Sequence, residues 1–168
     1  MDCKQTANVD TEKTAGPTAD SCYCAVGFLW NSDEDMCGKD CSDVENADGD
    51  EGPTADSCHC TVGLIWDSGS SSCKKDCREV GNAAGDSGPT TDSCDCAEDF
   101  LWNSADDLCG KDCSETSNAD TEKTAGPTAD SCYCAVGFLW NSDENLCGKD
   151  CTADENADGD VGPTATIC

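Results

Sequence analysis

The chain has 168 residues, 18 of them cysteine, and carries a formal net charge of −27. Its 36 acidic residues against nine basic ones argue against nucleic-acid binding and against anionic lipid, since phosphates would be repelled. Cysteine at this frequency is typical of a disulfide scaffold.

The cysteines recur with one spacing, which predicts a tandem array. Cys41, Cys58, Cys60 and Cys73 form the pattern C-x16-C-x-C-x12-C, and the flanking repeats differ by two extra residues in the first loop. A period of about 36 residues indicates repeated small units, because one globular fold would not show it. The predicted repeats 1 to 4 span 1–38, 39–74, 75–110 and 111–148, and a half repeat spans 149–168.

A longer repeat, made of several of these units, is also present in the sequence. Residues 10–35 reappear at 120–145 with a single change, Asp35 to Asn145, so that 1–58 matches 111–168 at an offset of 110 residues. We therefore expect a segment of a longer array. The start, Met1 to Lys4, has no apolar run and does not resemble a signal peptide, which favours a mature or excised piece.

Within a repeat, the elements follow in a fixed order. A polar loop such as 42–57 is rich in turn formers, and a short run such as 62–66 is apolar and β-prone. A polar turn, 67–72, then leads to the last cysteine, which predicts a small β-hairpin and no helix. The predicted fold class is a small disulfide-rich protein, a tandem array of four-cysteine β-hairpin units.

The segments between repeats are only three residues long, as in 38–40. Such a segment cannot act as a flexible tether, so the sequence predicts a rod or a superhelix. Lysines in these segments, such as Lys39 and Lys74, are expected to pair with acidic residues of the adjoining repeat.

Disulfides are expected because apolar residues are too sparse for a self-sufficient core in so short a repeat. Closing a loop of ~15 residues stabilises by roughly 3 kcal/mol in the chain-entropy model. Disulfides need an oxidising compartment, which predicts an extracellular or cell-surface location. No apolar run is long enough for a membrane span.

Four cysteines allow three connectivities, and the sequence alone does not choose among them. Sequential pairing is favoured because the two cysteines of Cys-x-Cys point to opposite faces of an extended segment, and because it uses every cysteine. The sequential pairs are Cys3–Cys22, Cys24–Cys37, Cys41–Cys58, Cys60–Cys73, Cys77–Cys94, Cys96–Cys109, Cys113–Cys132, Cys134–Cys147 and Cys151–Cys168.

The motif Cys22-x-Cys24-x2-Gly27-Phe28, followed by Cys37, resembles the C-terminal half of an EGF-like module. The resemblance implies that the second cysteine of each Cys-x-Cys bridges to the last cysteine around a hairpin. The chain departs from that family in having four cysteines per repeat instead of six. It also has Asp99 where the other repeats have glycine, although aspartate tolerates a left-handed conformation. The array also resembles tandem cysteine-rich surface proteins of unicellular eukaryotes.

Acidic loops suggest calcium as the only candidate cofactor. Alternating carboxylates in a glycine-containing loop suit a hard cation, and the candidate ligands are Asp48, Asp50, Asp158 and Asp160. No stretch completes an EF-hand, and Ala84 replaces one acid in repeat 3. A structural turn and a calcium site are both open interpretations.

Two further residue types recur once per repeat. The tryptophans either form a row that binds glycans or each cover a disulfide; they are Trp30, Trp66, Trp102 and Trp140. The threonines after Gly-Pro lie in loops where O-glycans could be attached; they are Thr18, Thr54, Thr90, Thr128 and Thr164. The only histidine, His59, stands at a position that varies between repeats, and no catalytic set is evident.

These patterns predict an extracellular structural protein that self-associates as part of a filament or a cell-surface stalk, and that is not an enzyme. The alternatives are a calcium-dependent adhesion or ligand-binding module with EGF-like repeats, and a cysteine-rich protease inhibitor.

Overall fold

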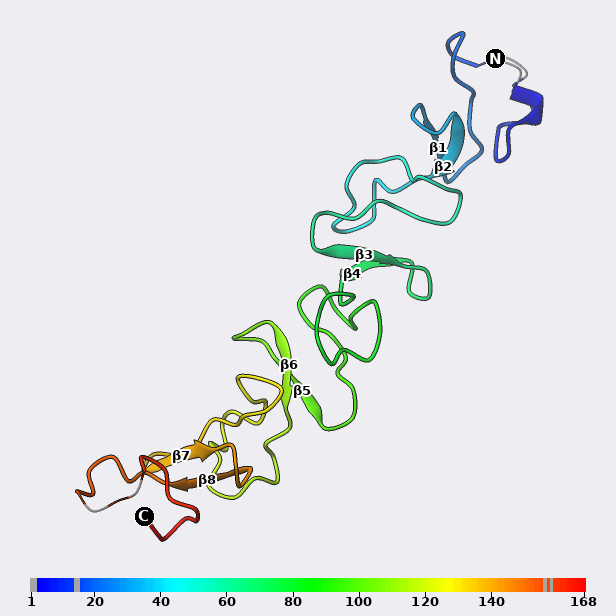
Figure 1. Cartoon of the computed structure of the whole chain (residues 1–168). Coiled ribbons are helices and arrows are strands. Elements are labelled where there is room, and N and C mark those ends of the chain that lie inside the picture. The colour runs from blue at the N-terminus through cyan, green and yellow to red at the C-terminus, as the bar shows by residue number, and fades with distance from the viewer. Residues whose placement is uncertain (1–2, 14–15, 156, 158) are drawn as a thin grey trace. The chain divides into compact units, whose positions relative to one another are not determined.

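The computed structural model describes residues 3–13, 16–155, 157 and 159–168. The chain divides into two compact units, Met1–Asp76 and Cys77–Cys168, and each contains two β-hairpins (Figure 1). The predicted fold class of tandem disulfide-rich hairpins is confirmed. In the described part of the chain, the one departure from the prediction of no helix is a single 3-10 turn, η1 (Cys3–Gln5).

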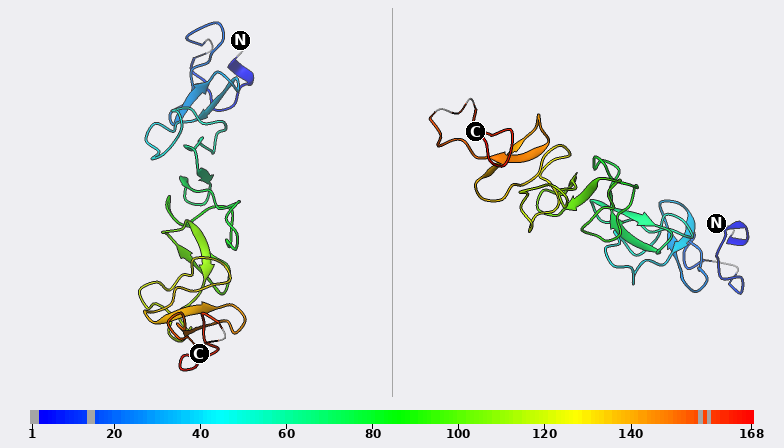
Figure 2. Two further views of the ribbon diagram at one scale, coloured as in Figure 1. Left: turned by 60° about the vertical axis from the view of Figure 1, so that its left-hand side comes forward. Right: turned by 90° about the horizontal axis from the view of Figure 1, so that it is seen from below.

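Each hairpin pairs two antiparallel strands of four residues, and loops without regular strands separate the hairpins along the chain (Figure 2). In the register, tryptophan stands opposite the last cysteine of its repeat, as Trp30 does with Cys37. The pairs are β1 (Phe28–Asn31) with β2 (Met36–Lys39), β3 (Leu64–Asp67) with β4 (Ser72–Lys75), β5 (Phe100–Asn103) with β6 (Leu108–Lys111), and β7 (Phe138–Asn141) with β8 (Leu146–Lys149).

The hairpin turns are stabilised by side-chain hydrogen bonds to the turn backbone and by residues that tolerate a left-handed conformation. The Asn31 carboxamide oxygen accepts hydrogen bonds from the amides of Asp33 and Glu34, at 3.0 and 3.2 Å. Asp35 then closes the turn with a φ of 53°, a left-handed conformation that aspartate and asparagine tolerate better than most residues.

A second tight turn precedes each hairpin. The amide of Phe28 donates to the Ala25 carbonyl at 3.1 Å, and Gly27 between them has a φ of 87°, as the third position of a type II turn requires. At the equivalent position of repeat 3, Asp99 has a φ of 70°. The prediction that aspartate can replace glycine in this turn is confirmed.

The nine disulfides follow the sequential pairing, from Cys3–Cys22 to Cys151–Cys168. Half-cystines also form the core, because Ala119 is the one other apolar residue that is buried among those described. Each repeat therefore has a core of sulfur with a few apolar side chains around it.

Two of the tryptophans pack against these disulfides. Trp102 and Phe100 lie on the cluster of buried half-cystines in repeat 3, and Trp140 lies on that of repeat 4. The polar end of the indole has no constant partner: Trp66 Nε1 donates to the Asp56 carbonyl at 3.0 Å, whereas Trp30 Nε1 is buried without a hydrogen bond. At Trp102 and Trp140 the indole covers sulfur, which favours the packing interpretation over glycan binding for these two residues.

Candidate functional site: the joints between repeats

The feature that recurs most faithfully is the joint, by which we mean the three residues between the last cysteine of one repeat and the first cysteine of the next. At the joint 38–40, the loop of repeat 2 pairs with β2. The amide of Lys39 donates to the Thr54 carbonyl at 2.8 Å, and the amide of Gly52 donates to the Lys39 carbonyl at 2.7 Å. The hairpin thus gains a third, short extended segment from its neighbour.

The second compact unit contains the same pairing twice. Lys111 exchanges hydrogen bonds with Thr128 and Gly126 at 2.9 and 2.8 Å, and Lys149 does so with Thr164 and Gly162 at 2.9 and 2.8 Å. Because these bonds use only backbone groups, they tolerate the side-chain differences between the loops.

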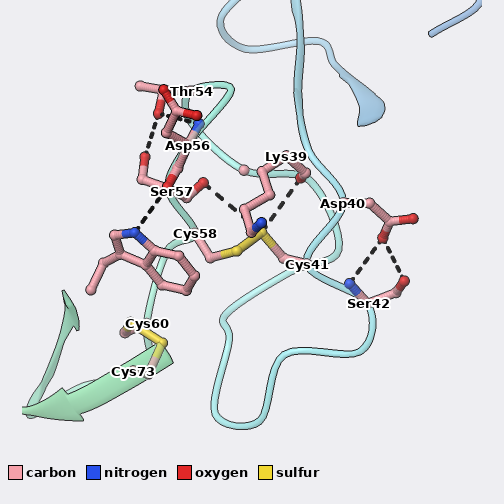
Figure 3. Close-up of a disulfide and its surroundings, with 12 residues drawn as sticks. Lys39, Asp40, Cys41, Ser42, Thr54, Asp56, Ser57, Cys58, Cys60 and Cys73 are labelled. Carbon is pink, nitrogen blue, oxygen red and sulfur yellow. Dashed lines mark hydrogen bonds between the residues drawn. A yellow bond between two sulfur atoms is a disulfide. The ribbon is translucent and has the colours of Figure 1, made fainter. Parts of the chain in front are cut away.

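The last residue of each joint is an aspartate, and Asp40, Asp112 and Asp150 organise the start of the next loop. The Asp40 carboxylate accepts hydrogen bonds from the hydroxyl and amide of Ser42 at 2.5 and 3.1 Å (Figure 3). These bonds, the hydroxyl first, hold the pKa of Asp40 below its usual range. Asp112 and Asp150 have lowered pKa values for the same reason.

A close approach of two glycines fixes each of these joints. A methyl group on the Gly38 α-carbon would lie 1.9 Å from the Gly52 carbonyl oxygen, and real β-carbons essentially never come within 3.0 Å of a heavy atom outside their own and the adjoining residues. The corresponding distances are 1.9 Å from Gly110 to Gly126 and 2.0 Å from Gly148 to Gly162. Only glycine fits at the first position of these three joints.

An asparagine side chain completes the contact. Asn31 Nδ2 donates to the same Gly52 carbonyl at 3.1 Å, and Asn31 is only 9% exposed. Asn103 and Asn141 donate equally to Gly126 and Gly162, at 2.9 and 3.3 Å. We use the name joint lock for this arrangement of a glycine, an asparagine and the carbonyl that both contact.

Sequence reasoning did not find the joint lock. Its partners come from two different repeats, 14 to 23 residues apart, and no single motif contains them. The signal that could have found it is the recurrence of asparagine directly after tryptophan and of glycine directly after the last cysteine, in three of the four hairpins.

The hairpin β3–β4 carries different residues at both positions. Asp67 stands in place of asparagine and Lys74 in place of glycine. Lys74 Nζ lies 3.0 Å from Asp67 Oδ2, so this lysine pairs within its own hairpin, contrary to the expectation that it pairs with the adjoining repeat. The hydroxyl of Ser70 also donates to Asp67, at 2.5 Å.

We expect the carboxyl group of Asp67 to have an unusually low pKa. The Ser70 hydroxyl and the Lys74 ammonium lower its pKa from 3.8 to about 2. Because the folded-state pKa is depressed, the contribution of Asp67 to stability is present above about pH 4 and is lost as the pH falls toward 2. NMR titration of the Asp67 carboxyl carbon measures this. Ser70→Ala should raise the midpoint more than Lys74→Ala, and a midpoint near 4 in the unaltered protein would contradict the assignment.

A cavity of about 240 Å³ lies between the turn of β1–β2 and the loop of repeat 2. It is lined by acidic residues, including Asp33, Glu34 and Asp48, together with His59. Among the residues that the structure describes, no three His, Cys, Asp or Glu side chains are placed to hold a metal ion. Of the candidate calcium ligands, Asp48, Asp50 and Asp160 are exposed, and Asp158 lies outside the described residues.

The equivalent cavity in the second compact unit has different chemistry. It measures about 250 Å³ and is lined by Trp102, Lys123 and Tyr133. The Tyr133 hydroxyl donates to Asp106 at 2.7 Å, which raises the pKa of the phenol, and Lys123 Nζ lies 4.4 Å from the ring centre. Since the two cavities share their place but not their side chains, they do not form a repeated binding site.

The threonines after Gly-Pro are engaged in local turns. The Thr54 hydroxyl lies 2.5 Å from the Ser57 hydroxyl and accepts the Asp56 amide at 3.3 Å (Figure 3). Thr18, Thr90 and Thr128 make the same contact with Ser21, Ser93 and Ser131 at 2.6 Å, and Thr164 lies 3.5 Å from the Thr166 hydroxyl. All five threonines are exposed, and O-glycosylation there stays a prediction.

Comparison with protein-family models, with curated proteins and with solved structures gave no match. In the described residues, no helix has the length and apolar character needed to cross a bilayer.

Proposed function

We propose that the protein is an extracellular structural protein, a segment of a filament or of a cell-surface stalk, without catalytic activity. The disulfides and the acidic surface are compatible with an oxidising, aqueous environment outside the cell. In this proposal the repeats act as spacers of fixed geometry, and copies of the chain associate through surfaces that recur along it.

The observation that carries the proposal is the contrast between the joints and the cavities. Gly38, Gly110 and Gly148 make one and the same contact at three joints. The side chains that could perform chemistry vary: His59 occurs in repeat 2 alone, and Lys123 has a counterpart, Lys13, only in repeat 1. A protein that repeats its geometry and varies its reactive groups fits a mechanical role better than catalysis or ligand binding.

The net charge of −27 makes a specific prediction for self-association. Copies of the chain repel one another at low ionic strength, and the repulsion is screened when the Debye length falls from ~30 Å at 0.01 M to ~8 Å at 0.15 M salt. We therefore expect assemblies in analytical ultracentrifugation to increase with sodium chloride over this range. Assembly that falls with salt would indicate an ionic interface and would contradict this account of the charge.

Electron microscopy of the oxidised native protein at physiological ionic strength tests the proposal itself. The expected result is filaments or elongated assemblies whose axial repeat is constant. A sample reduced with dithiothreitol serves as the control, because loss of the disulfides should abolish them. Fields that contain only isolated single chains in the oxidised sample would contradict the proposal.

The acidic cavity beside His59 favours one second candidate, a calcium-dependent adhesion module. In that case calcium would have to draw together carboxylates that line this cavity, such as Asp48, and would stiffen the joint at 38–40. Isothermal titration calorimetry separates the two candidates. The structural proposal expects no saturable heat up to millimolar calcium. Saturable binding that Asp48→Asn removes, with Asp86→Asn as the matched control in repeat 3, would favour adhesion.

A further inference from the structure

Two side chains meet across the joint at 110–112, one from each adjoining repeat. The hydroxyl of Tyr133, which stands between the two cysteines of Cys-x-Cys in repeat 4, donates to Asp106 Oδ2 at 2.7 Å. Asp106 lies in the turn of hairpin β5–β6 and also accepts a hydrogen bond from Asn103 Nδ2, at 2.9 Å. One carboxylate therefore links the tyrosine to the asparagine of the joint lock, which binds the Gly126 carbonyl.

The equivalent residues at the joint 38–40 face the same cavity. In the sequence, Glu34 corresponds to Asp106, three residues after the asparagine of the lock, and His59 corresponds to Tyr133. Glu34 and His59 both line the cavity of about 240 Å³ at this joint. A phenol and an imidazole can each donate a hydrogen bond, whereas an ionised carboxylate only accepts. Each of these two joints thus combines one donor with one acceptor.

The residue between the two cysteines does not vary independently of its loop. Lys123 Nζ lies 4.4 Å from the ring centre of Tyr133, and Lys13 Nζ lies 4.3 Å from that of Tyr23. Both lysines stand in the first loops that are two residues longer, and the two shorter loops contain neither this lysine nor a tyrosine between the cysteines. The loop length, the lysine and the tyrosine therefore change together from repeat to repeat.

The sequence of repeats 2 and 3 follows the same rule of one acceptor. Only one repeat has an aspartate between its two cysteines, Asp95 in repeat 3. The hairpin that precedes it in the chain is the only one without a carboxylate at the turn position, where it has Ser70. Two carboxylates never share the pair of positions.

We propose that these two positions, the turn residue of a hairpin and the residue between the cysteines of the next repeat, form a pairing site that determines which loop a hairpin accepts. A hairpin with a carboxylate accepts a loop with tyrosine or histidine and disfavours one with aspartate, because two carboxylates repel each other and neither has a proton to donate. The site assigns His59 as the partner of Glu34. The inference goes beyond the proposed function, since it concerns neighbouring repeats of one chain and holds whether or not copies assemble.

A double-mutant cycle in the oxidised full-length chain tests the observed contact. Tyr133→Phe keeps the ring beside Lys123 and removes only the hydroxyl. Hydrogen exchange at the amides of Lys111 and Gly126, which donate across the joint, should accelerate roughly two- to tenfold, as the loss of one hydrogen bond implies. In an Asp106→Ala chain the same substitution should have no further effect. Equal acceleration in both backgrounds would overturn the proposal.

A second set of variants tests the selectivity of the site. Tyr133→Asp adds a carboxylate, and Tyr133→Asn is its neutral control of the same shape. The two amides should exchange faster in the aspartate variant than in the asparagine variant, and the difference should shrink when salt is raised from ~0.01 M to ~0.15 M. Asp106→Ser should abolish the difference, and Tyr133→His should leave exchange close to that of the unaltered chain. A difference that persists with Asp106→Ser would contradict the pairing.

The joint 38–40 tests whether the site is shared. His59→Asp should accelerate exchange at the amides of Lys39 and Gly52 more than His59→Asn does, and Glu34→Ser should remove this excess. An excess that Glu34→Ser leaves unchanged, or no excess at all, would refute the assignment of His59. If an aspartate variant fails to form its nine disulfides, which intact mass reveals, the Tyr133→Phe cycle decides the proposal.

Discussion

Replacing Gly110 by alanine is expected to detach the loop of repeat 4 from hairpin β5–β6. The added methyl group would lie 1.9 Å from the Gly126 carbonyl oxygen, which is backbone and cannot rotate away. Overpacking of this kind costs about 1–3 kcal/mol. Amide hydrogen exchange at Lys111 and Gly126, whose amides donate across the joint, should accelerate roughly 5- to 100-fold.

Gly85→Ala provides the matched control for this prediction. A methyl group at Gly85 meets no atom within 4 Å, so the same substitution should change stability by less than ~0.5 kcal/mol. If Gly110→Ala and Gly85→Ala leave exchange at Lys111 equally slow, the close glycine approach does not hold the joint.

Removing the disulfide Cys96–Cys109 with paired alanine substitutions is expected to unfold hairpin β5–β6. The loss of such a disulfide typically costs 2–5 kcal/mol, and Phe100 and Trp102 pack on a cluster in which buried half-cystines are the main component. Exchange of the β5 and β6 amides, followed by mass spectrometry at peptide resolution, should become fast. Because the hairpin also holds Gly126 at its joint, the loop of repeat 4 should lose protection with it.

The effect should stay within the compact unit Cys77–Cys168. Repeat arrays are stabilised by contacts between neighbours, so hairpin β1–β2 serves as an internal control and should keep its exchange rates. Hairpin β5–β6 amides that remain protected in this variant would contradict the view that sulfur forms the core.

The hairpins could be predicted because their determinants are local. Trp30 and its apolar neighbours, the polar turn and the last cysteine lie within 14 residues, and Gly27 or Asp99 meets the conformational demand of the turn before the hairpin. The 3-10 turn at Cys3–Gln5 was not predicted, since one buried half-cystine followed by two exposed polar residues carries no periodicity.

The joint lock could not be predicted for a different physical reason. It joins Gly38 and Asn31 to a backbone carbonyl in the next repeat, and although the glycine and the asparagine recur in the sequence, nothing in their chemistry identifies that carbonyl as their partner. The short length of the joint did indicate that neighbouring repeats are closely connected. It could not indicate that one glycine and one asparagine determine how closely the next loop approaches the hairpin. Nor could it indicate that Lys74 and Asp67 replace these two residues together in repeat 2.

The sequential pairing of the cysteines also limits how far the chain can be stretched. A pulling force along repeat 2 passes through Cys41–Cys58 and then through Cys60–Cys73, whose Cα atoms are 5.9 and 5.7 Å apart, so both loops are bypassed. Only the backbone from Cys58 to Cys60 and from Cys73 to Cys77 bears load, roughly 20 Å when extended, against roughly 120 Å for an open chain of one period. In the oxidised chain, extension is therefore confined to these short segments, and a reducing environment would release the loops and make the same chain several times longer under load.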